Sequence, residues 1–160
     1  MNSDSNKQSG GSLVCATRGG AGSRAVQEKA ISYAQESGSR LIFLHIVDTS
    51  NVNGIEESLQ VALQYELNWL GNALLNIAHK RAENHRIASK IVIREGKVAD
   101  EIVSFLEEES ADLLLLGAPR GTSASILGDD PVERFAESIE RESGVSVEII
   151  RPESPEGDSL

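Results

Sequence analysis

Four consecutive leucines, at positions 113–116, constrain the fold of this chain more than any other feature of its sequence. Turn-forming residues bound the run, since Asp112 precedes it and Gly117 follows it. A continuous apolar run of this kind is typical of a strand that is buried on both faces, at the centre of a parallel sheet. In open α/β sheets the usual ligand site is the crevice at the carboxyl ends of the strands. We therefore predict a strand over residues 112–116 and expect any ligand just past it.

Apolar runs and helical patterns alternate along the rest of the chain. Ser23 suits the N-cap of the first helical pattern, and Gly38 suits its C-terminal stop. Strands that alternate with helices indicate crossover units and a parallel sheet. We predict a single doubly wound α/β domain over residues 12–151, with a disordered arm at residues 1–11 and a disordered acidic tail at residues 152–160. The predicted strands cover residues 13–17, 41–47, 88–94, 112–116 and 145–150, and the predicted helices cover residues 24–37, 55–84, 98–109 and 131–142.

The longest predicted helix, residues 55–84, carries an apolar stripe at three- and four-residue spacing. It would be about 45 Å long, more than a small sheet needs, and Gly71 is a candidate bend or break. Tyr65 and Trp69 lie beside the stripe, where they either widen the buried face or contact a partner chain. We favour the buried interpretation. The stripe, which we predict to face the core, consists of Ile55, Leu59, Ala62, Leu63, Leu67, Leu70, Leu74 and Ile77.

The composition disfavours several classes of function. The chain has 15 Lys and Arg residues against 25 Asp and Glu, a net charge of −10, so we expect neither nucleic acid nor an anionic membrane surface as a partner. Cys15 is the only cysteine, which rules out an intrachain disulfide, and its apolar surroundings predict a buried side chain. No run approaches the roughly 18 apolar residues of a membrane span, and the N-terminus has no signal-peptide core. We expect a soluble cytoplasmic protein.

The sequence contains no recognisable catalytic or metal-binding constellation, and we predict that the protein is not an enzyme. It lacks the Gly-x4-Gly-Lys-[Ser/Thr] loop of P-loop NTPases and the Gly-x-Ser-x-Gly elbow of hydrolases. His79 and His85 are six residues apart, so they do not share a helix face as a metal-binding pair would. His45 lies in an apolar predicted strand, where a hydrogen-bonded core histidine is a more common role than a ligand or a base.

Five short segments have an informative order and spacing: residues 13–17 (LVCAT), 41–48 (LIFLHIVD), 94–96 (REG), 111–117 (ADLLLLG) and 144–147 (GVSV). Together they resemble the universal stress protein family, and the resemblance covers nearly the whole chain from Leu13 to Arg151. It implies a five-stranded parallel sheet in the order 3-2-1-4-5 with helices on both faces. It also implies a stress-related role and a homodimer joined through the last strand, residues 145–150. Some members of the family hold an adenine nucleotide and others do not.

The nucleotide-holding members share a phosphate loop, Gly-x2-Gly-x9-Gly-[Ser/Thr], from which this chain departs. After Gly117 the next glycine is Gly121, one residue late, and Gly128 follows after six intervening residues instead of nine. Asp129 takes the place of the hydroxyl residue. A helix N-terminus attracts anions, but an aspartate there caps the same N–H groups and repels a phosphate. The Asp-Asp-Pro sequence at this point is also explained as an ordinary capped helix start.

The position that contacts the adenine base differs as well, because Arg18 follows Ala16 and Thr17 where the family's nucleotide binders have an aspartate. A guanidinium group has only donors, so it cannot accept a hydrogen bond from the adenine amino group. Arg18 could instead hold a phosphate, or pair with Asp129 or Asp130 across the crevice. The resemblance therefore implies a crevice that has been altered both where the phosphates would bind and where the adenine base would bind.

Other features still suit a phosphate. Glycines at positions 19, 20 and 22 leave the first loop open to close approach, and Asp48 is a possible acceptor for a ribose. We predict a dimeric, non-catalytic stress-response module that has a degenerate nucleotide crevice, needs no cofactor and acts through protein partners. The alternative is a protein whose conformation or assembly is regulated by bound ATP or AMP. The crevice residues that match the family's site are Ala16, Thr17, Arg18, Val47, Gly117, Arg120, Gly121, Gly128 and Asp129.

Overall fold

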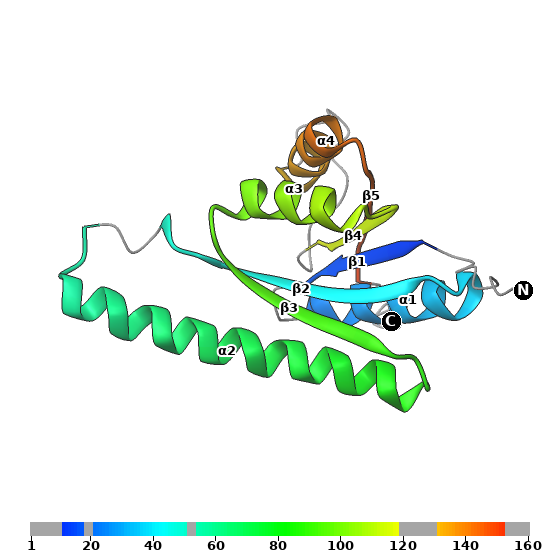
Figure 1. Ribbon diagram of the computed structural model, residues 1–160, viewed down its shortest axis with the longest axis horizontal. Coiled ribbons are helices and arrows are strands. Elements are labelled where there is room, and N and C mark those ends of the chain that lie inside the picture. Colours follow the sequence, from blue (N-terminus) through cyan, green and yellow to red (C-terminus); the bar gives the residue numbers. More distant parts are fainter. Residues whose placement is uncertain (1–10, 18–20, 51–53, 119–130, 153–160) are drawn as a thin grey trace, which may run out of the picture.

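In the computed structural model, five strands and four helices alternate along the chain (Figure 1). The structure describes residues 11–17, 21–50, 54–118 and 131–152. The predicted order of elements is confirmed, and apart from the start of the first helix every boundary lies within two residues of its predicted position. The strands are β1 (Ser12–Ala16), β2 (Arg40–Asp48), β3 (Ser89–Gly96), β4 (Leu113–Gly117) and β5 (Ser146–Ile150), and the helices are α1 (Ala21–Ser37), α2 (Glu57–Asn84), α3 (Val98–Glu109) and α4 (Pro131–Ser143).

The five strands form one parallel sheet in the order β3-β2-β1-β4-β5, as predicted. β1 lies at the centre, where Val14 pairs with Ile42 on one side and with Leu114 on the other. The leucine-rich strand β4 is an inner strand, and its Leu114 and Leu115 are fully buried. Strand order reverses between β1 and β4. In open α/β sheets the ligand crevice lies at the carboxyl ends of the strands at such a reversal, and we use the word crevice for this position.

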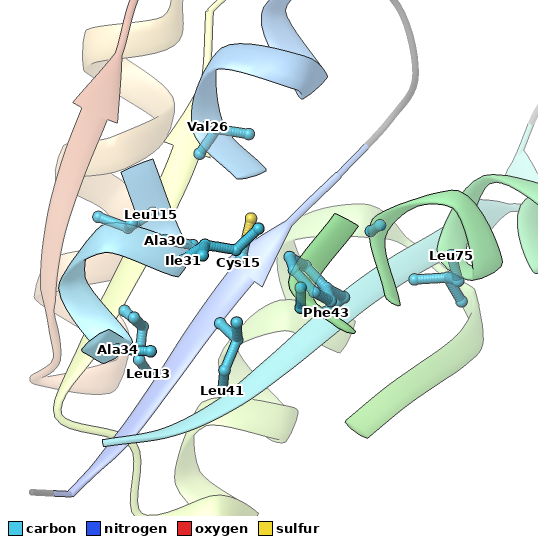
Figure 2. Close-up of a cluster of buried hydrophobic side chains, with 12 residues drawn as sticks. Leu13, Cys15, Val26, Ala30, Ile31, Ala34, Leu41, Phe43, Leu75 and Leu115 are labelled. Carbon is cyan, nitrogen blue, oxygen red and sulfur yellow. The ribbon is translucent and has the colours of Figure 1, made fainter. Parts of the chain in front are cut away.

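The sheet separates two hydrophobic cores. Leu13 and Cys15 of β1 belong to the core under α1 and α2, whereas Val14 belongs to the core under α3 and α4. Figure 2 shows the first core, in which Phe43 of β2 and Leu75 of α2 join the side chains from α1. Because helices cover both faces of the sheet, the inner strands carry continuous apolar runs instead of an alternating pattern.

Helix α1 begins earlier than the sequence predicted. We expected Ser23 to cap the helix and residue 24 to start it, but the helix begins at Ala21 and includes Ser23 in its first turn. Ser23 is only 7% exposed, so tertiary packing holds it inside the helix instead of leaving it as a solvated cap. The helix ends where expected, because Gly38 adopts a φ of 75°, which favours glycine and stops a helix.

Helix α2 is continuous through Gly71, so the predicted bend or break is wrong. Gly71 instead allows close packing on the sheet. A Cβ atom at this position would lie 2.6 Å from Cδ2 of His45 and 2.8 Å from Cδ1 of Ile93. Only one large side chain, Leu75, lies among the residues that α2 buries, which are Gly71, Leu75, Ala78 and Ala82.

The predicted buried stripe of α2 is also wrong, and so is the assignment of Tyr65 and Trp69 to the core. Tyr65 is 72% exposed and Trp69 is 64% exposed. Figure 1 shows the reason, since the N-terminal half of α2 extends past the sheet. Where the helix does meet the sheet, small residues allow the closest approach and therefore form the contact. Of the predicted stripe, Leu67 and Leu74 are half-buried, and Ile55, Leu59, Ala62, Leu63, Leu70 and Ile77 are exposed.

Two predictions concern the ends of the chain and its relation to membranes. The predicted disorder of residues 1–11 and 152–160 falls, apart from residues 11 and 152, outside the described residues. Among the helices that the structure describes, none combines the length and the apolar character required to cross a bilayer.

Candidate functional site

The candidate site is the crevice at the carboxyl ends of β1 and β4. Main-chain hydrogen bonds continue one residue past the end of each strand and fix the position of the chain where it leaves the sheet. The N–H of Thr17 donates to the carbonyl of Leu44 at 2.9 Å, and the N–H of Ala118 donates to the carbonyl of Ile150 at 2.9 Å. Ala16 and Gly117 end the two adjacent strands. The structure therefore brings together three predicted site residues, Ala16, Thr17 and Gly117.

Thr17 begins a chain of side-chain hydrogen bonds. Its Oγ1 accepts from Nε2 of Gln27 at 2.8 Å, and Oε1 of Gln27 accepts from a guanidinium nitrogen of Arg81 at 2.6 Å. Thr17 and Gln27 are each only 2% exposed. Buried polar groups need such partners, because an unsatisfied one costs about 1–3 kcal/mol. The chain links β1, α1 and α2 directly beneath the crevice.

His45 of β2 supports the same corner. Its Nδ1 lies 2.8 Å from the carbonyl oxygen of Thr17, so this nitrogen carries the proton when the two groups share a hydrogen bond. The sequence predicted a hydrogen-bonded core histidine, and His45 is hydrogen-bonded but half-buried. Its ring also lies against Gly71 of α2, which links the position of the long helix to the crevice.

Asp48 ends β2 and turns the chain into the following loop. Its Oδ1 accepts from the main-chain N–H of Ser50 at 2.9 Å and from the Ser50 hydroxyl at 2.5 Å. These two hydrogen bonds hold the pKa of Asp48 below its ordinary value. The oxygen that we considered as a ribose acceptor is thus engaged within its own turn. The carboxylate stabilises the connection, and a ligand would compete with Ser50 for Oδ1.

Val47 was predicted as a crevice residue, but its side chain is only 3% exposed and belongs to the interior. The other predicted residues, Arg18, Arg120, Gly121, Gly128 and Asp129, lie outside the described residues, as does the pairing of Arg18 with Asp129 or Asp130. Sequence reasoning missed Gln27 and Arg81. No local pattern could have found them, because the two residues are 54 positions apart and become partners only in the fold.

Cys15 and possible metal-binding clusters were the remaining candidates for a reactive site in the described structure. Cys15 is fully buried, and burial raises the pKa of its thiol far above the ordinary value, so it remains a neutral apolar side chain. The prediction of a buried cysteine is confirmed. Across the described ranges, no three His, Cys, Asp or Glu side chains come together in a way that could hold a metal ion.

A cavity of about 520 Å³ lies at the opposite edge of the sheet, near the amino ends of β2 and β3. Its lining includes three cationic residues, Arg40, Arg86 and Lys90. Arg40 donates to Oγ of Ser12 at 2.5 Å, and Lys90 lies 3.8 Å from a carboxylate oxygen of Glu109. Two of the three cations therefore have local partners. The cavity is separate from the crevice at the carboxyl ends of the strands.

The fold and the crevice together define a doubly wound α/β domain of the kind that binds ligands at a topological switch point. Residues 11–151 match the universal stress protein family, and the chain belongs to this family. The resemblance to this family, which the sequence indicated, is confirmed over nearly the full length of the chain.

Known proteins are similar to this chain in sequence or in fold. A universal stress protein of Methanothermobacter thermautotrophicus is 27% identical over 116 residues, which cover 71% of this chain and 77% of the relative. The structure of universal stress protein UspA from Lactobacillus plantarum has a TM-score of 0.71 at 16% identity, covering 91% of this chain and 100% of that one. An Arabidopsis thaliana protein of the family, solved with AMP bound, has a TM-score of 0.59 at 17% identity and covers 92% of this chain and 96% of its own.

Proposed function

We propose that the protein is a cytoplasmic stress-response module that forms a dimer, catalyses no reaction and acts through protein contacts. In this proposal its crevice does not hold a nucleotide tightly. One observation supports the proposal most directly: the polar side chains beneath the crevice bond to one another. Gln27 joins Thr17 to Arg81, and His45 bonds the carbonyl of Thr17. Groups that satisfy each other in this way are not offered to a ligand.

A nucleotide that used Thr17 or Gln27 would have to break these bonds. A buried polar group would then lose its partner, at a cost of about 1–3 kcal/mol. That cost corresponds to a loss of roughly 5- to 150-fold in affinity. The sequence adds a second argument, since Arg18 and Asp129 replace the residue types that nucleotide-holding relatives use.

The dimer in this proposal forms through β5, an edge strand of the sheet. The N–H of Val147 already donates to a carboxylate oxygen of Glu140 at 3.0 Å, so this main-chain donor has a partner. Glu148 accepts from the hydroxyl of Tyr33 at 2.8 Å, and this bond to a carboxylate raises the pKa of Tyr33. Half-buried side chains of Ile149 and Ile150 would supply the apolar part of the contact. Analytical ultracentrifugation of the Val147→Lys variant and the wild type tests this dimer contact. If the two proteins have the same oligomeric state, the proposed contact through β5 is contradicted.

A second candidate function is regulation of conformation or assembly by ATP or AMP. The relative from Arabidopsis thaliana was solved with AMP, and its fold covers most of this chain. Ala16 pairs with Leu116, the residue before Gly117, so two small residues end neighbouring strands at the switch point. Small side chains at such a position would let a ligand approach the backbone closely.

One experiment separates the two candidates. Small molecules are released from the purified protein and identified by mass spectrometry, and ATP and AMP are then titrated by calorimetry with and without magnesium. We expect no co-purified nucleotide and no heat of binding at micromolar nucleotide. Saturable heat in the micromolar range would overturn the proposal and favour the regulated alternative.

A matched pair of variants shows whether any observed heat of binding comes from the crevice. Ala16→Leu fills the space at the end of β1, whereas Glu137→Lys changes an exposed position on α4. Heat that disappears only in Ala16→Leu comes from the crevice. Incubation with ATP followed by detection of ADP and AMP tests the absence of catalysis, and turnover that purifies with the protein would contradict it.

A further inference from the structure

The cavity near the amino ends of β2 and β3 has a charge balance opposite to that of the whole chain. In the full sequence, 25 acidic residues outnumber 15 Lys and Arg residues. Among the described residues that line this cavity, three are cations, Arg40, Arg86 and Lys90, and one is a carboxylate, Glu109. A concave site lined mainly by one sign of charge raises the local concentration of ligands of the opposite sign. The cavity therefore has the charge to attract an anion.

Two chain connections and the end of α3 form this cavity. Residues 38–40 lead from α1 into β2, and residues 86–90 lead from α2 into β3. Both connections lie at the amino ends of the parallel strands, at the end of the sheet opposite to the crevice. The volume of about 520 Å³ falls within the range of roughly 300–1,000 Å³ that is typical of small-molecule sites. The cavity thus has room for a small organic molecule.

Arg86 supplies a cation whose donors are not used within the protein. In the part of the chain that the structure describes, its side chain makes no hydrogen bond or ion pair. Arg86 follows the C-cap residue His85 of α2 and adopts a φ of 60°. Glycine is the usual residue in this left-handed conformation, and Gly38 and Gly144 occupy the corresponding positions after α1 and α4. An arginine here runs against the backbone preference, and a role for its guanidinium group in binding explains it.

Arg40 and Lys90 retain the capacity to bind an anion although each has a partner. Arg40 donates one hydrogen bond to Oγ of Ser12 at 2.5 Å, and a guanidinium group has five N–H donors in all. That bond orients Arg40 and leaves other donors for a ligand. Nζ of Lys90 lies 3.8 Å from a carboxylate oxygen of Glu109, and the Lys90 side chain is 64% exposed. An exposed pair at this distance is weak, so an anion can take the place of Glu109.

The helix ends around the cavity do not require these cations as caps. Basic side chains near a helix C-terminus often bond its last carbonyl groups. Here the N–H of Gly38 donates to the carbonyl of Ala34 at 2.9 Å, and the N–H of Ile87 donates to the carbonyl of Ala82 at 2.9 Å. Because the main chain satisfies these carbonyls, the guanidinium groups of the cavity are not needed there as donors.

We propose that this cavity binds a small organic anion with two negative charges, held by Arg40, Arg86 and Lys90. The planar fork of an arginine matches both phosphate and carboxylate groups, so a dianion of either chemistry suits the site. Leu41 and Ile87 add apolar walls for the rest of the ligand. The site is independent of the proposed function, which involves the crevice and β5.

Calorimetric titration of the full chain with inorganic phosphate, and separately with succinate, tests the proposal at constant ionic strength. We expect saturable binding of at least one of them with a dissociation constant below about 1 mM, and the comparison distinguishes phosphate from carboxylate recognition. Amide shifts in NMR spectra locate the site and should concentrate at residues 38–42 and 86–90. The proposal is overturned if neither anion binds, or if the shifts occur only around residues 16–17 and 117–118.

Three variants assign the binding to named charges. Arg86→Gly removes the cation and suits the left-handed backbone, so it should be at least as stable as wild type while binding the anion at least about tenfold more weakly. Glu109→Gln removes the competing carboxylate and should tighten binding by about threefold or more. The control, Arg141→Gln, removes one positive charge at an exposed position of α4 and should leave the affinity unchanged. Wild-type affinity in Arg86→Gly, or weaker binding in Glu109→Gln, would contradict the proposed site.

Discussion

The two halves of helix α2 have similar apolar content but different surroundings. In the C-terminal half, Leu75 is 1% exposed and Ala78 and Ala82 are fully buried. In the N-terminal half, Leu59 is 56% exposed and Tyr65 is 72% exposed. The difference shows that helical periodicity identifies an amphipathic helix without identifying what its apolar face contacts.

Element lengths explain the difference. Strands β2 and β3 contain nine and eight residues, which span about 26–30 Å. Helix α2 contains 28 residues and spans about 42 Å. More than 10 Å of helix therefore has no strand beneath it, and the large apolar side chains of that segment are exposed in the described structure.

The largest expected effect comes from shortening a leucine side chain in each half of α2 and comparing the losses in stability. Leu75→Ala removes a side chain from the core and should lower the free energy of unfolding by about 2–5 kcal/mol. Leu70→Ala, the same substitution five residues earlier, should lower it by about 0.5 kcal/mol or less in dilute protein. Urea denaturation at low micromolar concentration measures both. Equal losses would mean that Leu70 is buried within the single chain.

Gly71→Ala probes the point at which the helix meets the sheet. The new Cβ would lie 2.6 Å from the His45 ring, which is held by its hydrogen bond to Thr17. Overpacking of this kind costs about 1–3 kcal/mol, more than the roughly 0.5–1 kcal/mol that alanine gains over glycine in a helix. We expect net destabilisation in urea denaturation. A stabilised variant would show that His45 moves aside without loss.

A polar substitution in the packed half has a smaller effect. Arg81→Met leaves Oε1 of the buried Gln27 without its donor and should lower the free energy of unfolding by about 1–2 kcal/mol. Lys80→Met is the matched control, because the neighbouring Lys80 is exposed, and it should change stability by less than about 0.5 kcal/mol. Thermal unfolding of the two variants compares them. Indistinguishable melting temperatures would argue against a structural role for the Thr17–Gln27–Arg81 chain.

The smallest expected effect concerns the connection that leads from β2 toward the exposed half. The pKa of Asp48 is lowered in the folded protein by its bonds to Ser50, so its contribution to stability is present above the ordinary value of 3.8 and is lost as the pH falls through the folded value. Asp48→Asn should therefore be less stable than wild type at about pH 6 and equal to it at about pH 2. Paired urea titrations across this range measure the difference, and a gap that persists at low pH would rule out the carboxylate as its source.

The sequence predicted much of the fold because many of its signals are local. Four leucines between Asp112 and Gly117 indicated a central parallel strand, and Gly38 indicated the end of α1. The start of α1 was predicted wrongly, because Ser23 is buried by contacts that a capping pattern does not contain. At the candidate site, the sequence identified Ala16, Thr17 and Gly117 but not Gln27, whose partners come from β1 and α2.

The sequence by itself determined the order of strands and helices, the burial of the inner strands and membership of the universal stress protein family. These properties follow from periodicity, turn residues and the spacing of short segments, all of which act over a few neighbouring positions. Only the tertiary structure decided which face of α2 is buried and which polar groups meet beneath the crevice. Both depend on distances between elements that are far apart in the chain. The face of α2 that contains Gly71 packs closely on the sheet, whereas the predicted stripe of larger apolar residues does not.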